Sequence, residues 1–332
     1  MASDRITTTH VGSLPRTEMV CDVILAREQG NGDQEGLFDA VLTEAVDAMV
    51  ERQVQLGIDI VSDGEFSKIS YATYIKDRLD GFSGSSPPIM GADLEDFPEY
   101  AQSLLAANKS PIKIVRPLCT GPVRVKNRKP LDDDLRRLRA AVDRHRPTGA
   151  FMPAASPGVI AVFQANRYYP THAAYLEALA RAMHEEYKAI LAAGFDLQID
   201  CPDLGVGRHL VFKDQSDAAF LRHAEEQVEA LNAALVGLQA ERMRMHVCWG
   251  NYEGPHHKDV PLEHIIGLVL KCKPQKLLIE SANPRHAHEW RVFERVKLPD
   301  DKVLVPGVID STVNYIEHPD LVADRIETFA RI

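Results

Sequence analysis

The sequence predicts an α/β fold: a (β/α)8 TIM-type barrel that lacks or truncates its last strand. Apolar, strand-like runs alternate with helical stretches, which is typical of a parallel sheet wrapped by helices. Polar side chains stand repeatedly at the carboxyl ends of these strands, where such a barrel builds its active site. A doubly wound sheet would gather its chemistry in one crevice instead. No G-x-G-x-x-G motif follows a strand, so a dinucleotide site is not expected.

Seven strands, each with a connecting segment, account for most of the chain. Two long helical stretches end at Gly57 and Gly194, and glycine is the favoured residue just after a helix. We expect a single catalytic domain over 1–332, with an excursion or lid at about 66–112 and a hairpin at about 113–127. The predicted strands span 6–12, 58–65, 150–158, 195–203, 242–250, 276–284 and 302–310, and the predicted helices span 35–56, 131–145, 171–193, 217–238 and 319–331.

Composition narrows the class of partner. The chain has 332 residues, 45% of them hydrophobic and 26% charged, as globular proteins do. Its net charge of −10 disfavours nucleic acid and anionic membranes, which attract basic surfaces. It contains no long apolar run, no signal peptide and no disulfide framework among its five cysteines, so a reducing cytoplasm is expected. Small molecules are the expected partners, and a homo-oligomer is left open.

The stretch MRMHVCWG predicts a metal site, because it ends a strand with His246 and Cys248. Residues i and i+2 of a strand point to the same face, with their Cα atoms about 6.5 Å apart. One zinc ion can bridge two such side chains, and Glu280 at the end of the next strand offers a carboxylate as third ligand. The mixed nitrogen, sulfur and oxygen set fits zinc better than magnesium or calcium. The alternative is packing, since a free cysteine behaves as a small buried hydrophobe.

Zinc at this position allows two kinds of chemistry. It can activate water for hydrolysis, which would need a general base such as Glu289 or Asp310. It can also favour the thiolate form of a bound thiol, and the thiolate is the nucleophile. A third alternative is a non-catalytic protein that binds zinc or a thiol.

With these motifs in place, the chain resembles the cobalamin-independent methionine synthase superfamily, specifically its C-terminal catalytic barrel. Zinc-dependent epoxyalkane:coenzyme M transferases belong to the same group. The resemblance runs from THVGSLPR to GVID, and it implies that His246 and Cys248 of H-V-C and Glu280 of I-E-S hold zinc. It also implies a methyltransferase of methionine biosynthesis acting on a small thiol, most directly homocysteine; an alkyl transfer to coenzyme M or another thiol is the alternative.

The resemblance extends to the binding of an amino-acid thiol. V-G-S-L-P-R implies that Ser13 meets the carboxylate of homocysteine, while S-D-G-E and L-Q-I-D imply that Glu65 and Asp200 meet its amine. Two carboxylates suit an ammonium group, which donates charge-assisted hydrogen bonds. The alternative for both acids is the capping of helix N-termini.

Three departures from the family pattern leave parts of the mechanism open. The family's eighth strand carries a second zinc cysteine, and the sequence stops at Ile332 before such a strand. Methionine synthases have D-I-H where this chain has I-D-S-T, so Asp310 is expected to replace the histidine unless that acid is not needed. The additional N-terminal barrel of the folate enzymes is absent, so the methyl or alkyl donor stays open.

Two histidine-rich segments flank the expected metal site, PHHKD at 255–259 and NPRHAHEW at 283–290. We expect both to be surface loops and helix starts; the alternative is that they bind substrate anions or gate access to the site. Arg285 and His286 follow Glu280 closely enough to reach the rim, so these two are expected to support the metal ligands.

Overall fold

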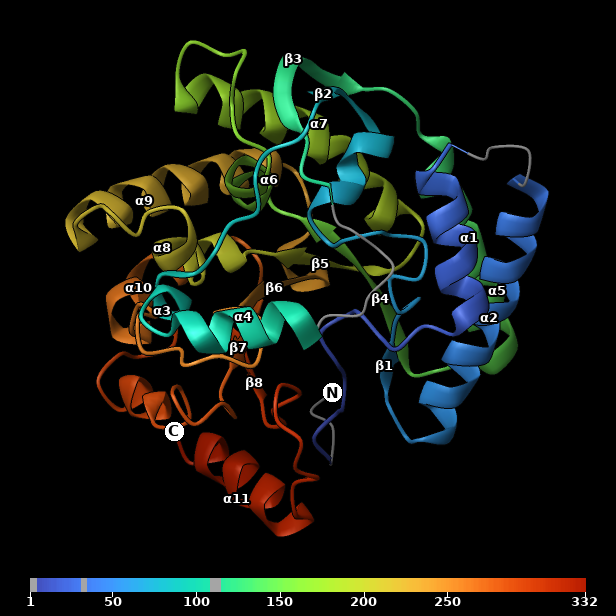
Figure 1. Cartoon of the computed structure of the whole chain (residues 1–332). Helices are drawn as coiled ribbons and strands as arrows, with labels where there is room; N and C mark the ends of the chain where they lie inside the picture. The colour runs from blue at the N-terminus through green and yellow to red at the C-terminus, as the bar shows by residue number, and fades with distance from the viewer. Residues whose placement is uncertain (1–4, 31–34, 108–114) are drawn as a thin grey trace.

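The structure is a computed structural model that describes residues 5–30, 35–107 and 115–332. Six parallel strands form one curled sheet in the order β1-β4-β5-β6-β7-β8 (Figure 1). Thr9 adds a seventh position, because it forms a parallel bridge to Ile60 of β1. The strands are β1 (Ile60–Val61), β4 (Gly149–Ala155), β5 (Asp196–Asp200), β6 (Met243–Val247), β7 (Lys276–Glu280) and β8 (Val303–Gly307).

Helices cover the outside of the sheet. In Figure 1, α1, α2 and α5 stand together beside β1, α7 lies near α9, and α11 lies beyond β8. Among the described residues, no helix combines the length and the apolar content that a bilayer crossing requires. The α-helices are α1 (Glu18–Glu28), α2 (Glu35–Gln55), α3 (Ala92–Glu95), α4 (Pro98–Ala107), α5 (Lys129–His145), α6 (Pro157–Phe163), α7 (His172–Ala192), α8 (Gly207–Leu210), α9 (Asp217–Ala234), α10 (Leu262–Val269) and α11 (Pro319–Ala330), and the 3-10 turns are η2 (Thr73–Asp77), η3 (Pro202–Leu204), η4 (Ala240–Arg242) and η5 (Glu289–Glu294).

A buried arginine fastens the N-terminal segment to the middle of the sheet. Arg244 of β6 donates to the Thr9 hydroxyl at 2.9 Å and to the His10 carbonyl at 2.7 Å, and its guanidinium lies 3.9 Å from the centre of the Phe151 ring. These contacts join residues more than 230 positions apart in the sequence, so the sheet must curl to make them. Within the described ranges, no ladder joins β8 to the segment around Thr9. The predicted truncated barrel is therefore confirmed.

The excursion after β1 differs from the expected arrangement. The hairpin expected within 113–127 is a single strand, β3 (Leu118–Val125), which pairs antiparallel with β2 (Leu79–Ser83) from the expected lid. Gly81 permits this pairing, since a Cβ there would lie 2.8 Å from the Gly121 carbonyl oxygen. The part of both predictions that falls on 108–114 lies outside the described residues. Further along, α4 packs on the loop after β6, where the Tyr100 hydroxyl donates to the Glu253 carbonyl at 2.8 Å.

A buried ion cluster joins the excursion to two outer helices. Arg78 donates to Asp134 of α5 at 2.6 Å and to Glu186 of α7 at 2.8 Å, and all three side chains are buried. Tyr74 donates to the same Glu186 oxygen at 2.6 Å. Because each charge is paired, the burial of these charges is tolerated. The loss of Arg78 would leave Glu186 uncompensated, whereas Asp134 would keep its pair with Arg137 at 3.0 Å.

We expect Arg78→Ala to lower the free energy of unfolding by about 3–5 kcal/mol, because it leaves the buried Glu186 without an ion partner and removes one of the two arginines that pair with Asp134. Urea unfolding followed by circular dichroism measures this. The control is Arg331→Ala, which removes an exposed pair with Glu327 and should change the stability by less than about 1 kcal/mol. Equal losses in the two variants would contradict the role given to the cluster.

Candidate active site

One cavity of about 550 Å³ opens at the carboxyl ends of the strands. It contains every residue that the sequence assigned to metal binding, substrate binding or catalysis. The residues that line it from this set are Ser13, Glu65, Asp200, His246, Cys248, Glu280 and Asp310.

Strand pairing brings the histidine of β6 beside an aspartate of β5. Asp200 and His246 are register partners, and His246 Nδ1 lies 3.4 Å from an Asp200 carboxylate oxygen. That same oxygen accepts a hydrogen bond from Gln198 at 2.8 Å, which fixes the carboxylate. Burial disfavours the imidazolium, but the Cys248 sulfur and the Asp200 carboxylate outweigh it and raise the pKa of His246 to about 10. The neighbours of His246 therefore favour positive charge at this point.

The third expected ligand comes from the next strand. Glu280 ends β7 and lines the same cavity. Burial raises the pKa of its carboxyl group; His286 and His256 oppose this effect, and Asp310 reinforces it. A carboxylate that is buried beside another acid is stabilised by a cation.

The donor set of the cavity fits a metal, although the three side chains are not drawn tightly together. An imidazole, a thiol and a carboxylate at the ends of adjacent strands are the ligand types that zinc takes. In the described part of the chain, the groups of three donors that lie within 4.8 Å of one another are two others, namely His256–Asp259–His286 and His172–His223–Glu226. His246, Cys248 and Glu280 would have to move toward one another to share an ion.

Glu65 stands in a strained turn that aims it into the cavity. Its φ of 58° lies in the left-handed region, which costs energy for a residue with a side chain. Asp63 holds the turn by accepting the Glu65 backbone N–H at 3.0 Å. The Glu65 carboxylate accepts a hydrogen bond from the Ser13 hydroxyl, and Lys68 Nζ lies 3.3 Å from its other oxygen. Such strain is found at functional sites, where the surrounding structure sustains it.

The capping alternative for the two acids finds no support in their contacts. Within the described residues, the Glu65 carboxylate contacts Ser13 and Lys68, and the Asp200 carboxylate contacts Gln198 and His246. None of these partners is a backbone N–H at the start of a helix. Both carboxylates therefore face the cavity rather than a helix terminus.

One carboxylate oxygen of Asp310 accepts hydrogen bonds, and the other has no partner among the described residues. Its Oδ1 accepts hydrogen bonds from the backbone N–H of Thr312 at 2.9 Å and from the Thr312 hydroxyl at 2.7 Å. Its Oδ2 is buried and has no hydrogen-bond partner. A buried acceptor without a partner is costly, so this oxygen is suited to a donor on a bound substrate.

The two histidine-rich segments are not simple surface loops, and that prediction was wrong for His256 and His286, which are both buried. Asp259 accepts from His256 at 2.7 Å and from His286 at 2.9 Å, and His209 lies 2.9 Å from its other oxygen. Burial opposes ionisation of Asp259, but the three imidazoles outweigh it and hold its pKa well below the usual range. His256 and His286 also interact electrostatically with Glu280, and both lower the pKa of its carboxyl group.

The other residues predicted around the metal separate into two kinds. Neither Arg285 nor His286 lines the cavity. Arg285 is exposed, and its guanidinium donates to the His257 carbonyl at 3.4 Å. Both carboxylate oxygens of Glu289 have partners: one lies 2.9 Å from His286, and the other accepts the Leu262 backbone N–H at 2.8 Å. His286 therefore belongs to the buried network that interacts with Glu280, whereas Arg285 does not.

The polar residues of the cavity that the sequence analysis missed include His10, Tyr71 and Asn251. His10 Nε2 lies 2.7 Å from the Gln53 side chain, while its buried Nδ1 has no partner. Burial and the nearby Cys248 raise the pKa of Tyr71 well above its ordinary value, so its phenol remains a donor. The position of His10 in the quoted segment THVGSLPR was a usable signal; the irregular sequence around Tyr71 gave none.

Comparisons with known proteins agree with this arrangement. The family model described as "Cobalamin-independent synthase, Catalytic domain" matches residues 6–144. A methionine synthase of Saccharolobus solfataricus is 25% identical over 326 residues, which cover 96% of this chain and 81% of that protein. A 5-methyltetrahydropteroyltriglutamate–homocysteine methyltransferase of Chelativorans sp. is 25% identical over 341 residues, but only 36% of its own length is covered.

Two solved structures share the fold. A B12-independent methionine synthase from Shewanella sp. W3-18-1, in complex with selenomethionine, has a TM-score of 0.69 at 20% identity, covering 90% of this chain and 79% of that one. A putative vitamin-B12 independent methionine synthase from Listeria monocytogenes has a TM-score of 0.64 at 22% identity, covering 99% and 88%. The curled parallel sheet is therefore the sheet of these proteins.

Gly205 controls the position of Cys248. A methyl group at Gly205 would lie 2.4 Å from the Cys248 carbonyl oxygen, which also accepts the Val206 backbone N–H at 3.2 Å. We expect Gly205→Ala to displace Cys248 and to weaken Co2+ binding through its sulfur at least about tenfold, because the loss of a contact that positions a metal ligand has an effect of this size. The sulfur-to-cobalt charge-transfer absorption reports this binding.

The matched control for this variant is Gly207→Ala, where the nearest atom would lie 3.9 Å from the added methyl group. This variant should bind Co2+ like the unmodified chain. An unchanged cobalt spectrum in Gly205→Ala would contradict the positioning role.

Asp203 lies next to the site but is buried away from the cavity, where it accepts from the Ser156 hydroxyl at 2.9 Å. Burial raises its pKa to about 7, against the opposing hydrogen bond from Ser156. The folded chain then binds a proton that the unfolded chain loses above about pH 4, so this group costs stability as pH rises from 4 to 7.

We expect Asp203→Asn to be more stable than the unmodified chain at pH 8, by up to about 4 kcal/mol, and equal to it near pH 4. Urea titrations across this pH range measure the difference. The exposed Asp300→Asn is the control and should show no such trend. A difference for Asp203→Asn that does not vary with pH would refute the assignment.

Proposed function

We propose that the chain is a member of the cobalamin-independent methionine synthase superfamily and a zinc-dependent methyltransferase that methylates homocysteine. The observation that carries the proposal is the single cavity lined by seven residues of matching chemistry. The names of the similar proteins support methyl transfer to homocysteine over alkyl transfer to coenzyme M. In this proposal residues 1–332 act as one catalytic domain, and the excursion carrying Tyr71 covers part of the cavity.

Homocysteine binding is assigned to one wall of the cavity. Its ammonium group would lie between Glu65 and Asp200, two buried carboxylates that gain from a cation. Its carboxylate would accept from Ser13, which then exchanges its hydrogen bond to Glu65 for one to the substrate. This pairing of charges orients the thiol toward β6 and β7.

The metal is assigned to His246, Cys248 and Glu280, supported by the buried network around Asp259. Zinc held there would supply the positive charge that favours the thiolate form of homocysteine at neutral pH. Asp310, with its unpartnered oxygen, is assigned the proton that the departing methyl carrier requires. Tyr71 is a further donor in the same cavity.

We assign the donor to the chemical class in the names of the longer relatives, a 5-methyltetrahydropteroyl glutamate. The chain spans about a third of the length of those relatives, which is why the donor needs its own test. Shorter relatives named methionine synthase are covered over 81% and 70% of their length.

The experiment is a methionine-formation assay with zinc, homocysteine and 5-methyltetrahydropteroyltriglutamate. Asp200→Asn should raise the KM for homocysteine by about 10- to 100-fold, since it removes one charge-assisted hydrogen bond. The control is Asp196→Asn at the opposite end of the same strand, where Asp196 pairs with Lys276. An unchanged KM in Asp200→Asn would remove homocysteine as the acceptor.

The rival classes predict different readouts from the same preparation. A zinc hydrolase turns over ester or amide substrates without any thiol, and a binding protein shows no turnover with any donor. Coenzyme M with an epoxyalkane replaces homocysteine and the methyl donor in the alkyl-transfer alternative. Methionine formation that requires both homocysteine and the metal supports the proposal; its absence with thiol-independent hydrolysis rejects it.

A further inference from the structure

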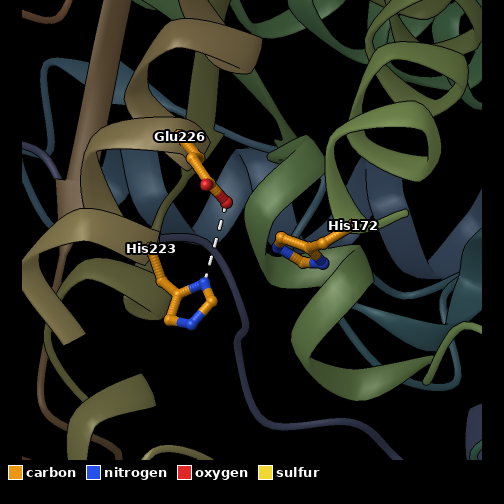
Figure 2. Close-up of side chains that lie close together, drawn as sticks. All are labelled: His172, His223 and Glu226. Carbon is orange, nitrogen blue, oxygen red and sulfur yellow. Dashed lines mark ion pairs between the residues drawn. The ribbon is translucent and has the colours of Figure 1, made fainter. Parts of the chain in front are cut away.

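Three metal-binding side chains meet outside the cavity, between two neighbouring helices. His172 is the first residue of α7, and His223 and Glu226 lie one turn apart on α9. Their donor atoms all lie within 4.8 Å of one another. Figure 2 shows the two imidazole rings and the carboxylate turned toward a common space between the helices. None of the three lines the cavity at the strand ends.

The imidazole nitrogens at this point have no hydrogen-bond partner. His172 Nε2 and His223 Nδ1 are both buried and unpartnered. The contact from His223 Nδ1 to Glu226 is 3.6 Å, which is too long for a hydrogen bond. Buried polar atoms are nearly always satisfied, and an unsatisfied one costs about 1–3 kcal/mol. Two such nitrogens beside one carboxylate could all coordinate a single cation.

The surrounding contacts hold the rings in place. Phe212 stacks on His223, with ring centres 4.8 Å apart and planes 23° apart. Thr171 caps α7 by accepting the Ala174 backbone N–H at 3.1 Å, which fixes the start of the helix at His172. Glu226 is the more exposed of the two donors on α9, with 47% of its side chain exposed against 34% for His223.

We propose that His172, His223 and Glu226 form a second metal site, separate from the cavity, which takes a divalent transition metal such as zinc or cobalt and clamps α7 to α9. Two imidazoles and one carboxylate are a donor set that zinc accepts, whereas magnesium and calcium prefer oxygen ligands throughout. Donors on one tetrahedral ion lie about 3.3 Å apart, so the three donor atoms, which now lie within 4.8 Å of one another, would move slightly closer to share an ion. Water would occupy the remaining position.

The test is a titration of the metal-free full chain with Zn2+ alone, following stoichiometry by calorimetry and the melting temperature. The background variant His246→Asn removes the proposed cavity site, so that one equivalent should remain. Adding His223→Gln should abolish that equivalent or weaken it by at least about 100-fold, since a lost ligand costs at least as much as a lost supporting contact. The zinc-induced rise in melting temperature should disappear with it.

Controls separate folding from binding. His318→Asn removes an exposed histidine that lies 3.5 Å from a single carboxylate, and asparagine keeps the cap of α11, so this variant should bind zinc unchanged. If His223→Gln does not fold, Glu226→Gln and His172→Gln replace it, one on each helix. Zinc binding that is unchanged by all three variants, or lost equally in His318→Asn, overturns the site.

The outcome is independent of the proposed activity. Loss of the equivalent with His223→Gln, in a chain that forms no methionine, would support this site and reject the methyltransferase. Methionine formation by a chain that binds one zinc ion, with that binding lost in His246→Asn but not in His223→Gln, would support the methyltransferase and reject this site.

Discussion

The parallel register of β5, β6 and β7 is the constraint on which the site depends. Asp200 pairs with His246, and Val247 pairs with Ile279, so the ends of three strands reach the same level. Side chains alternate between the faces of a strand, and a slip of one residue would turn His246 and Cys248 away from the cavity. The buried Arg244 secures this register from inside, because it ties β6 to the N-terminal segment that carries Ser13.

Four acidic side chains line the cavity, and burying a carboxylate without a positive partner is unfavourable. Glu65, Asp200, Glu280 and Asp310 all line it, and burial raises the pKa of Glu280. Like charges at close quarters disfavour ionisation, so a cation that enters is stabilised strongly. A metal ion and the ammonium group of an amino acid are both cations, and the proposed reaction needs both. Lys68 pairs with Glu65, and His246 lies beside Asp200. These two side chains offset only part of the negative charge of the four acids.

Much of this could be predicted from the sequence because strand ends are local signals. The apolar runs gave the strands, and the polar residues that follow them gave seven of the residues that line the cavity. The ribbon of β2 with β3 was missed, since its pairing joins residues about 40 positions apart across an irregular segment. His286 and Arg285 show the same limit. They are adjacent in one loop, yet one is buried against Asp259 and the other is exposed, and only packing decides between them.

The most direct test of the central claim is X-ray absorption at the zinc edge of the full chain, measured on His223→Gln so that the cavity site is observed alone. The account predicts one sulfur from Cys248 among nitrogen and oxygen neighbours, its loss in Cys248→Ser, and an additional sulfur when homocysteine is added. A spectrum with nitrogen and oxygen alone, unaffected by Cys248→Ser or by homocysteine, would contradict the account.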